Sequence, residues 1–165
     1  MSYLIELLNP THKRDEFDCE QESLNLYLHK HASQDVERHL AVCYVIVTDK
    51  NEVKGYYTLS NSSIDKDLIP NHIRKKLSYK DIPVTLLGRL ARDKRYYTER
   101  LGETLLLDAL NRCYDSSFKI GSLAVVVDPI DEKARTFYLK YGFINLPDCK
   151  KMFISMKTIS QIFKS

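Results

Sequence analysis

The chain has 165 residues, of which 44% are hydrophobic and 28% charged, and its formal net charge is +3. This length and composition are those of a globular protein, so we expect a single domain over residues 1–165. No stretch approaches the ~18 consecutive apolar residues of a membrane helix, and the first residues turn polar too early for a secretory signal. We therefore expect a cytosolic protein.

The first half of the chain alternates between strand and helix patterns. Alternating side chains predict a first strand that contains Tyr3, Ile5 and Leu7. Helical spacing then predicts a helix within 17–38, with a buried face made of Leu24, Tyr27, Leu28 and Ala32. An apolar, β-branched run at 41–48, a polar turn and the segment 53–60 (VKGYYTLS) together predict an antiparallel hairpin.

The second half begins with a short basic helix near 70–77 and a strand at 82–92. A helix at 101–114 follows, with one apolar face made of Leu101, Leu105, Leu106, Ala109, Leu110 and Cys113. The run 122–128 (SLAVVVD) is continuously apolar from 123 to 127, which predicts a strand buried on both faces.

The segment 131–143 has the clearest helix signals. Acidic Asp131 and Glu132 open it, and Gly142 follows its last turn. Phe137 and Tyr141 are expected in the core, with Tyr138 adjacent to that face. A strand within 150–157 closes the sheet. The whole order predicts an α/β domain whose mixed, largely antiparallel sheet is parallel at the strand-helix-strand unit and flanked by helices.

The cysteines give no sign of a metal site. All four are widely separated, without a Cys-x-x-Cys pair. Cys43 and Cys113 fall in apolar runs and are expected to be small buried side chains. Residue type alone would allow a zinc site from Cys19, His29, His31 and His39. Because the tight ligand pairs of structural zinc are absent, we expect no metal.

Basic residues gather at 73–76 (IRKK) and 88–95 (GRLARDKR), followed by Arg100. A charge run is usually a solvated face, but it also suits an anion-binding surface for phosphates or a nucleic acid. Charge alone leaves both interpretations open.

A turn that could bind phosphate lies between the strand at 82–92 and the next helix. It reads RYYTERLGETLL over 95–106. A helix N-terminus presents backbone N–H groups that, with the helix dipole, can hold a diphosphate. Gly102 would permit close approach, and Arg95 or Arg100 could add charge-assisted contacts. The turn is neither a Walker loop nor a dinucleotide fingerprint, so Gly102 could equally serve helix packing.

Taken together, these segments resemble the GNAT family of acetyl-CoA-dependent N-acetyltransferases, over essentially the whole chain. This likeness is carried by five features in order: the hairpin, the strand at 82–92, the turn at a helix start, the strand at 122–128, and a helix that ends in FYLKYGF. Four ordered segments, FDCEQESLNLYLHKHASQ, GYYTLS, IPVTLLGRLARD and LGETLLLDAL, further resemble GNAT toxins of bacterial toxin–antitoxin pairs. Members of that group acetylate the α-amine of aminoacyl-tRNA and stop translation, which is the function that the resemblance implies here.

The resemblance also implies acetyl-CoA as co-substrate and a set of residues that bind it. Pantetheine would pair with the end of the strand at 82–92, and the pyrophosphate would lie on the turn before the helix at 101–114. The binding residues implied are Leu90, Ala91, Arg92, Tyr97, Thr98, Glu99, Arg100, Leu101, Gly102, Glu103 and Thr104. The family pattern is Gln/Arg-x-x-Gly-x-Gly/Ala. Here Tyr97 replaces Gln/Arg and Arg100 replaces the first glycine, so a side chain stands where close backbone approach is expected.

The chemistry implied by the family needs few side chains. An α-amine has a pKa of about 7.7–8.0 and is partly neutral at pH 7, so a strong general base is dispensable. A backbone N–H near Leu90 to Arg92 would stabilise the oxyanion. Tyr138 matches the family position that protonates or hydrogen-bonds the leaving thiolate, although the helix pattern alone would make it a core residue.

The partners implied are aminoacyl-tRNA, a cognate antitoxin of the ribbon-helix-helix type, and a second copy in a homodimer. We expect the tRNA backbone to contact Arg74, Lys75, Lys76, Arg89 and Arg92. Arg89 and Arg92 share one side of the strand only if a bulge intervenes. Two other functions stay open: a GNAT enzyme that acetylates a small amine or a protein N-terminus, and a non-catalytic GNAT-fold binding module.

Overall fold

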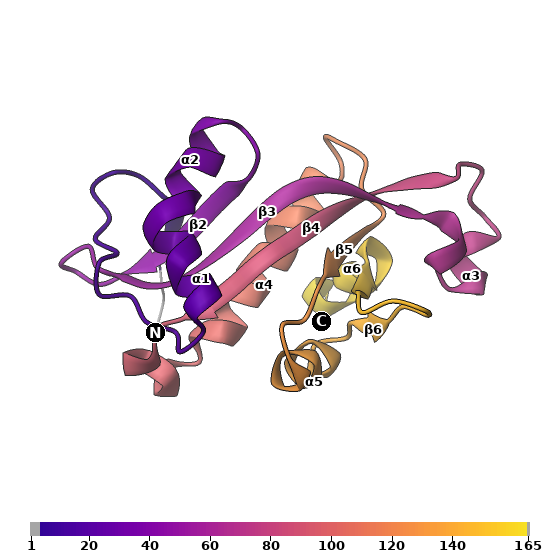
Figure 1. Ribbon diagram of the computed structural model, residues 1–165. Coiled ribbons are helices and arrows are strands. Elements are labelled where there is room, and N and C mark those ends of the chain that lie inside the picture. The colour runs from indigo at the N-terminus through magenta and orange to yellow at the C-terminus, as the bar shows by residue number, and fades with distance from the viewer. Residues whose placement is uncertain (1–3, 165) are drawn as a thin grey trace. The chain divides into compact units, whose positions relative to one another are not determined.

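The computed structural model describes residues 4–164 (Figure 1). Contacts divide the chain into two compact units, which we describe separately. Unit 1 comprises residues 1–60 and 87–109, and unit 2 comprises 61–86 and 110–165. Three long elements begin in one unit and end in the other: β3 (Val53–Asp65), β4 (Asp81–Arg92) and α4 (Leu101–Ser116). That residues 1–165 form a single domain stays a prediction.

Unit 1 contains strands in the order β1-β2-β3-β4. β1 (Ile5–Leu7) and β2 (Val42–Val47) pair antiparallel, and so do β2 and β3. The predicted hairpin is therefore confirmed, with a register irregularity between Ile46 and Val47. Of the predicted first strand, Tyr3 lies outside the described residues.

The helical segment of unit 1 lies across these strands, as Figure 1 shows for α1 and α2. It consists of α1 (Glu22–Leu26), the π-helical turn η1 (Tyr27–His31) and α2 (Ala32–Glu37). Its buried side chains Tyr27, Leu28 and Ala32 share one core with Cys43, Val45 and Tyr56 of the strands. The predicted buried face of this helix is confirmed, with Leu24 packed at its edge.

The long helix α4 follows a short 3-10 helix, η3 (Lys94–Glu99), that the sequence did not predict. All six apolar side chains predicted for one face of α4 are buried: Leu101, Leu105, Leu106, Ala109, Leu110 and Cys113. The periodicity of this segment thus identified the helix and its buried face.

Unit 2 contains strands in the order β3-β4-β5-β7-β6. β5 (Ala124–Val127) is buried throughout, pairs parallel with β4 at Thr85 and Leu86, and pairs antiparallel with β7 (Met152–Ser155). The predicted α/β class with a mixed sheet that is parallel at the strand-helix-strand unit is confirmed. The sequence missed η2 (Lys66–Leu68), β6 (Ile144–Asn145) and α6 (Met156–Lys164).

Two helices of unit 2 were predicted with inexact details. The basic helix near 70–77 is reduced to α3 (Asn71–Arg74). α5 (Glu132–Lys140) begins where predicted, and Gly142 after it has a φ of 101°, the left-handed conformation expected of a glycine that ends a helix. The prediction that Phe137 and Tyr141 are core residues was wrong, because both are only partly buried and Tyr138 is the buried ring.

Candidate active site

Asp93 fixes the turn between β4 and α4. Its carboxylate is fully buried and accepts hydrogen bonds from the Arg95 backbone N–H at 2.8 Å and from the Arg95 guanidinium at 3.0 and 2.8 Å. A fourth donor is the backbone N–H of Asp18 at 3.2 Å. Burial opposes ionisation, but these donors outweigh it and lower the pKa of Asp93. Arg95 is thus engaged by Asp93, although its side chain is 38% exposed, and Arg100 has the more exposed guanidinium of the two.

Lys54 of β3 holds the other end of the turn. Its ammonium forms an ion pair with Glu99 and lies 4.7 Å from the centre of the Tyr96 ring. Lys54 is almost completely buried and the Glu99 side chain is 30% exposed, so the pair is partly shielded from solvent. The Glu99 carboxylate, predicted among the cofactor-binding groups, therefore serves to anchor η3.

Arg100 has the backbone conformation that a glycine would favour. Its φ of 54° and ψ of 38° lie in the left-handed region, where a side chain costs about 1–2 kcal/mol. The side chain is 82% exposed, and its nearest acidic partner is Glu103 at 3.8 Å. The position that carries a glycine in the family pattern thus keeps the turn geometry, and the guanidinium points to solvent.

The N-terminus of α4 offers backbone donors directly after Arg100. Its first turn comprises Leu101, Gly102 and Glu103, whose N–H groups precede the first i to i−4 bond of the helix, from Thr104 to Arg100 at 3.1 Å. The 16-residue helix adds its dipole to these donors. This arrangement can hold an anion such as a diphosphate.

Gly55 of β3, which the sequence analysis did not single out, packs against β4 and α4. A Cβ at this position would lie 2.9 Å from Leu105 Cδ1 and 3.1 Å from the carbonyl oxygen of Ala91. A larger residue would therefore require the Leu105 side chain to move and the Ala91 backbone to shift slightly. Of the predicted pantetheine strand, Ala91 is buried in the core, whereas Leu90 and Arg92 are partly exposed.

The structure does not bring Arg89 and Arg92 together. The Arg89 guanidinium lies 3.5 Å from the centre of the Tyr27 ring in η1. The Arg92 guanidinium lies 6.0 Å from the centre of the Tyr97 ring in η3. The two arginines of β4 therefore contact different elements of unit 1.

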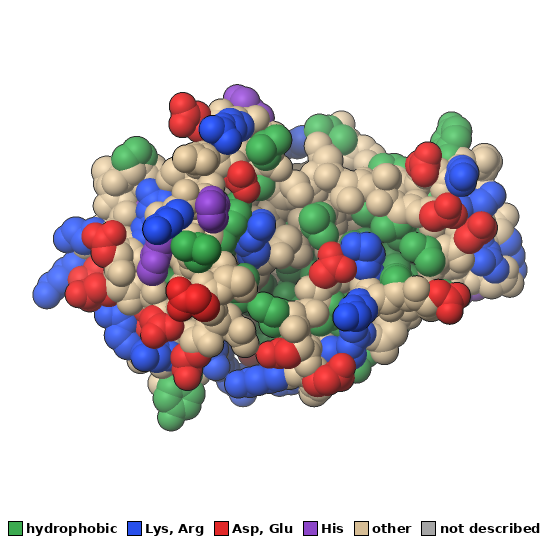
Figure 2. Space-filling view, viewed as in Figure 1, with side chains coloured by type: hydrophobic (Ala, Val, Ile, Leu, Met, Phe, Trp, Pro, Cys, Tyr) green, Lys and Arg blue, Asp and Glu red, His purple; other side chains and the backbone are tan. Residues whose placement is uncertain are grey.

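The predicted basic cluster at 74–76 lies in unit 2, in and just after α3. Arg74 donates hydrogen bonds to the carbonyl of Asp67 at 3.1 Å and to Asn71 Oδ1 at 3.2 Å, so its guanidinium is partly occupied. Lys75 and Lys76 are exposed. On the face shown in Figure 2, basic and acidic side chains are interspersed rather than gathered into a uniform basic surface.

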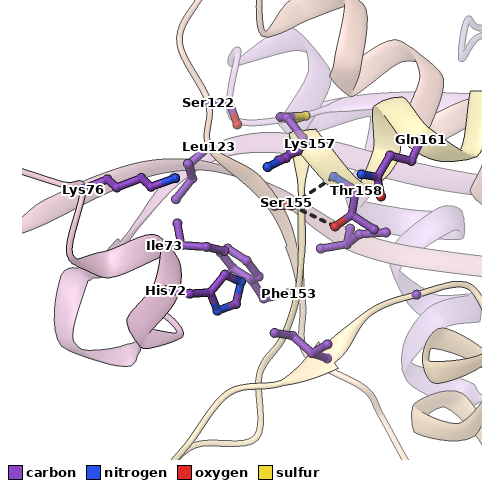
Figure 3. Close-up of a pocket in the computed structure, with 14 residues that line it drawn as sticks. His72, Ile73, Lys76, Ser122, Leu123, Phe153, Ser155, Lys157, Thr158 and Gln161 are labelled. Carbon is purple, nitrogen blue, oxygen red and sulfur yellow. Dashed lines mark hydrogen bonds between the residues drawn. The ribbon is translucent and has the colours of Figure 1, made fainter. Parts of the chain in front are cut away.

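Lys76 also lines a pocket of about 540 Å³ in unit 2 (Figure 3). Its walls come from α3, β7, α6 and the segment before β5, and apolar side chains such as Leu123 and Phe153 dominate. Ser155 Oγ accepts the Thr158 N–H at 3.1 Å and so caps α6 beside it. Besides Lys76, the pocket contains none of the described residues predicted to bind acetyl-CoA or tRNA.

Tyr138 is an almost buried phenol whose hydroxyl has no partner among the residues that the structure describes. Only 8% of the residue is exposed, and its ring contacts Phe137 and Phe143. No described residue hydrogen-bonds this hydroxyl. In the same part of the chain, every fully buried side-chain oxygen has a hydrogen-bond partner. The remaining exposure of Tyr138 must therefore include its oxygen. Burial raises the pKa of this phenol, which keeps it protonated.

Residues 4–164 contain no group of three or more His, Cys, Asp or Glu side chains arranged to hold a metal ion. Over the same residues, no helix has the length and apolar character needed to cross a membrane.

Comparison with known proteins finds close relatives, although no protein-family model matches the chain. A tRNA-acetylating toxin of Mycobacterium tuberculosis is 33% identical over 127 residues, which are 77% of this chain and 75% of the relative. The structure of AtaT complexed with acetyl-methionyl-tRNAfMet has a TM-score of 0.92 and 32% identity, covering 99% of this chain and 100% of that one.

Two further solved structures carry other ligands. AtaTR bound with acetyl-CoA has a TM-score of 0.86 and 33% identity, covering 98% of both chains. A mutant AtaT bound to the C-terminus of the antitoxin AtaR has a TM-score of 0.86 and 30% identity, covering 100% of both chains.

Proposed function

The chain belongs to the tRNA-acetylating toxins of the GNAT acetyltransferase family, and we propose that it transfers acetyl from acetyl-CoA to the α-amine of aminoacyl-tRNA and thereby blocks translation. The observation that carries this proposal is the match of nearly the whole chain to AtaT in complex with an acetylated aminoacyl-tRNA. A blocked α-amine can no longer accept a growing peptide, so the acetylated tRNA is useless for elongation.

The turn before α4 and the first turn of that helix are our candidates for the acetyl-CoA diphosphate site. The backbone N–H groups of Leu101, Gly102 and Glu103 would donate to it, and the left-handed backbone at Arg100 supports this by retaining the geometry of a glycine. The exposed Arg100 guanidinium adds a charge-assisted contact. Tyr97 and Thr98, both exposed, complete the turn.

The backbone of β4 from Leu90 to Arg92 pairs with the pantetheine amides as an added strand. One of its N–H groups stabilises the oxyanion that forms when the α-amine attacks the thioester carbonyl. The C–N bond forms, the C–S bond breaks, and the amine loses its proton to water or to a backbone carbonyl. The Tyr138 hydroxyl donates to the leaving thiolate, a role that its protonated, unpaired state supports.

Basic residues bind the tRNA backbone in this proposal. They are Arg89 and Arg92 of β4 and the cluster Arg74, Lys75 and Lys76. Phosphate contacts of this kind orient the acceptor stem without reading its sequence.

We also propose the surroundings in which the enzyme works. A cognate antitoxin neutralises it, as the AtaT complex with the C-terminus of AtaR suggests. A ribbon-helix-helix antitoxin and a homodimeric toxin are the expectations from the family. The site of action is the cytoplasm, where acetyl-CoA and charged tRNA are both available.

One acetylation assay tests the function against its alternatives. Radiolabelled acetyl-CoA is offered with bulk charged tRNA, with free amino acids and small amines, and with peptides. We expect label in charged tRNA only. Label in amines or peptides instead would favour another GNAT substrate class, and no label anywhere, with no acetyl-CoA binding by calorimetry, would favour a non-catalytic module.

A further inference from the structure

Arg89 is half-buried, and its guanidinium has no hydrogen-bonding partner in the part of the chain that the structure describes. Its central carbon lies 3.5 Å from the centre of the Tyr27 ring, so the two groups are in direct contact. Within residues 4–164 no side chain or backbone group hydrogen-bonds or ion-pairs with its N–H donors. A guanidinium carries five N–H donors in one plane, and a ring against its face leaves those at the edge available.

The Tyr27 ring is held firmly. The residue is only 5% exposed, and its hydroxyl donates to Asp35 Oδ2 at 2.8 Å. Its ring lies nearly parallel to that of Tyr56, with centres 6.3 Å apart. The Tyr56 hydroxyl in turn donates to the Leu24 carbonyl at 2.7 Å. Tyr27 is therefore a fixed surface against which Arg89 rests.

Tyr27 also opens the π-helical turn η1 (Tyr27–His31) between α1 and α2. Such turns are rare and are frequently found at functional sites, where the wider turn redirects a side chain. Asp35, the acidic group nearest to this ring, is already engaged by the tyrosine hydroxyl and does not pair with Arg89. The arrangement keeps a cation in place without neutralising it.

We propose that Tyr27 positions Arg89 to bind the phosphodiester on the 5′ side of the terminal adenosine of the aminoacyl-tRNA. This inference rests on the proposed function. Arg89 immediately precedes Leu90 to Arg92, the segment proposed to hold the thioester, and residues along a strand are only about 3.3 Å apart. The anion bound there must therefore lie close to the reacting amine. The phosphate carried by the same ribose as the aminoacyl ester meets this condition, and a guanidinium matches its oxygens in a bidentate contact.

A set of small acceptors tests this assignment. The first is 3′-aminoacylamino-adenosine, which has the reacting α-amine but no phosphate. The second is the same compound extended by a cytidine, which adds one phosphodiester. For the wild-type protein we expect kcat/KM to rise by roughly tenfold or more when the phosphodiester is added, the scale of one charge-assisted contact.

The variants separate positioning from mere packing. Arg89→Lys and Tyr27→Leu should lose most of this rise, mainly through KM, and their loss of kcat/KM should be much larger on the phosphodiester acceptor than on the phosphate-free one. Tyr27→Phe keeps the ring against which Arg89 rests but releases Asp35 from its hydrogen bond, so it should retain more of the rise than Tyr27→Leu. Arg38→Lys, a change at an exposed arginine after α2, is the matched control. Thermal melting checks the fold of each variant, and Arg89→Lys carries the test if Tyr27→Leu does not fold.

The outcomes are distinct. A full rise in Arg89→Lys, or equal loss on both acceptors, would overturn the assignment to this phosphate. A wild-type protein that acetylates both acceptors equally well would also overturn it, while leaving the proposed function intact. A wild-type protein that acetylates neither these acceptors nor charged tRNA would overturn the proposed function and this inference together.

Discussion

Replacing Tyr138 by phenylalanine removes one oxygen from a site where it has no hydrogen-bond partner within the described chain. Folding should therefore be unaffected, with a change in unfolding free energy within about 0.5 kcal/mol. If the hydroxyl protonates or hydrogen-bonds the leaving thiolate, kcat should fall about a hundredfold, which is about 2.7 kcal/mol of transition-state stabilisation.

The assay is steady-state acetylation of charged tRNA, with acetyl-CoA affinity measured separately by calorimetry. Acetyl-CoA binding should be unchanged in Tyr138→Phe, so that the loss is confined to turnover. Tyr114→Phe is the matched control, because Tyr114 lies in the same unit and its ring packs edge-on against Phe118. That variant should keep the wild-type kcat.

The pH dependence adds a second criterion. Burial raises the pKa of Tyr138 above its ordinary value of 10.0, so the phenol keeps its proton up to at least pH 10. The wild-type rate should therefore show no alkaline loss from this group below pH 10. Full kcat in Tyr138→Phe would refute the reasoning and make Tyr138 a core residue only.

Three further predictions concern the turn, the basic cluster and acid stability. Arg100→Glu should weaken acetyl-CoA binding measured by calorimetry, and wild-type affinity in this variant would contradict a role for the guanidinium. Arg100→Gly should raise the melting temperature, because glycine adopts the left-handed backbone without strain. Replacing all three residues of the cluster at 74–76 by alanine should reduce the salt slope of tRNA binding by about three units and spare acetyl-CoA binding; an unchanged slope would contradict this. A hydrogen bond from the Glu20 amide, with two further donors, lowers the pKa of Asp18 from 3.8 to about 2. Because the folded-state pKa is depressed, this stabilisation is complete above pH 4 and lost as pH falls through 2. In Asp18→Asn the melting temperature should therefore depend less on pH over that range than in the wild type.

Long periodic elements of this fold could be predicted from sequence, and short ones could not. The apolar face of α4 and the continuous run of β5 are strong patterns, and both were identified. β6 has only two residues, and β7 passes into α6 at Met156 without a turn residue between them. In α5 the spacing grouped several aromatic rings, but it did not reveal which neighbouring ring is buried, because that depends on the sheet beneath.

The candidate site shows the same limit. The turn before α4 was found from its place between a strand and a helix. Its anchor, Asp93, was missed because one of its donors, the backbone N–H of Asp18, comes from a distant part of the chain. The contact between Arg89 and Tyr27 likewise joins residues far apart in sequence and depends on a π-helical turn that no local pattern announces.

The central claim is that the chain acetylates the α-amine of aminoacyl-tRNA. Its most direct test is mass spectrometry of charged tRNA incubated with the protein and acetyl-CoA, then digested so that the terminal aminoacyl-adenosine is released. We predict that this fragment gains the mass of one acetyl group, located on the α-amine, and that the gain requires acetyl-CoA. An unmodified aminoacyl-adenosine, from a protein that binds acetyl-CoA, would contradict the account.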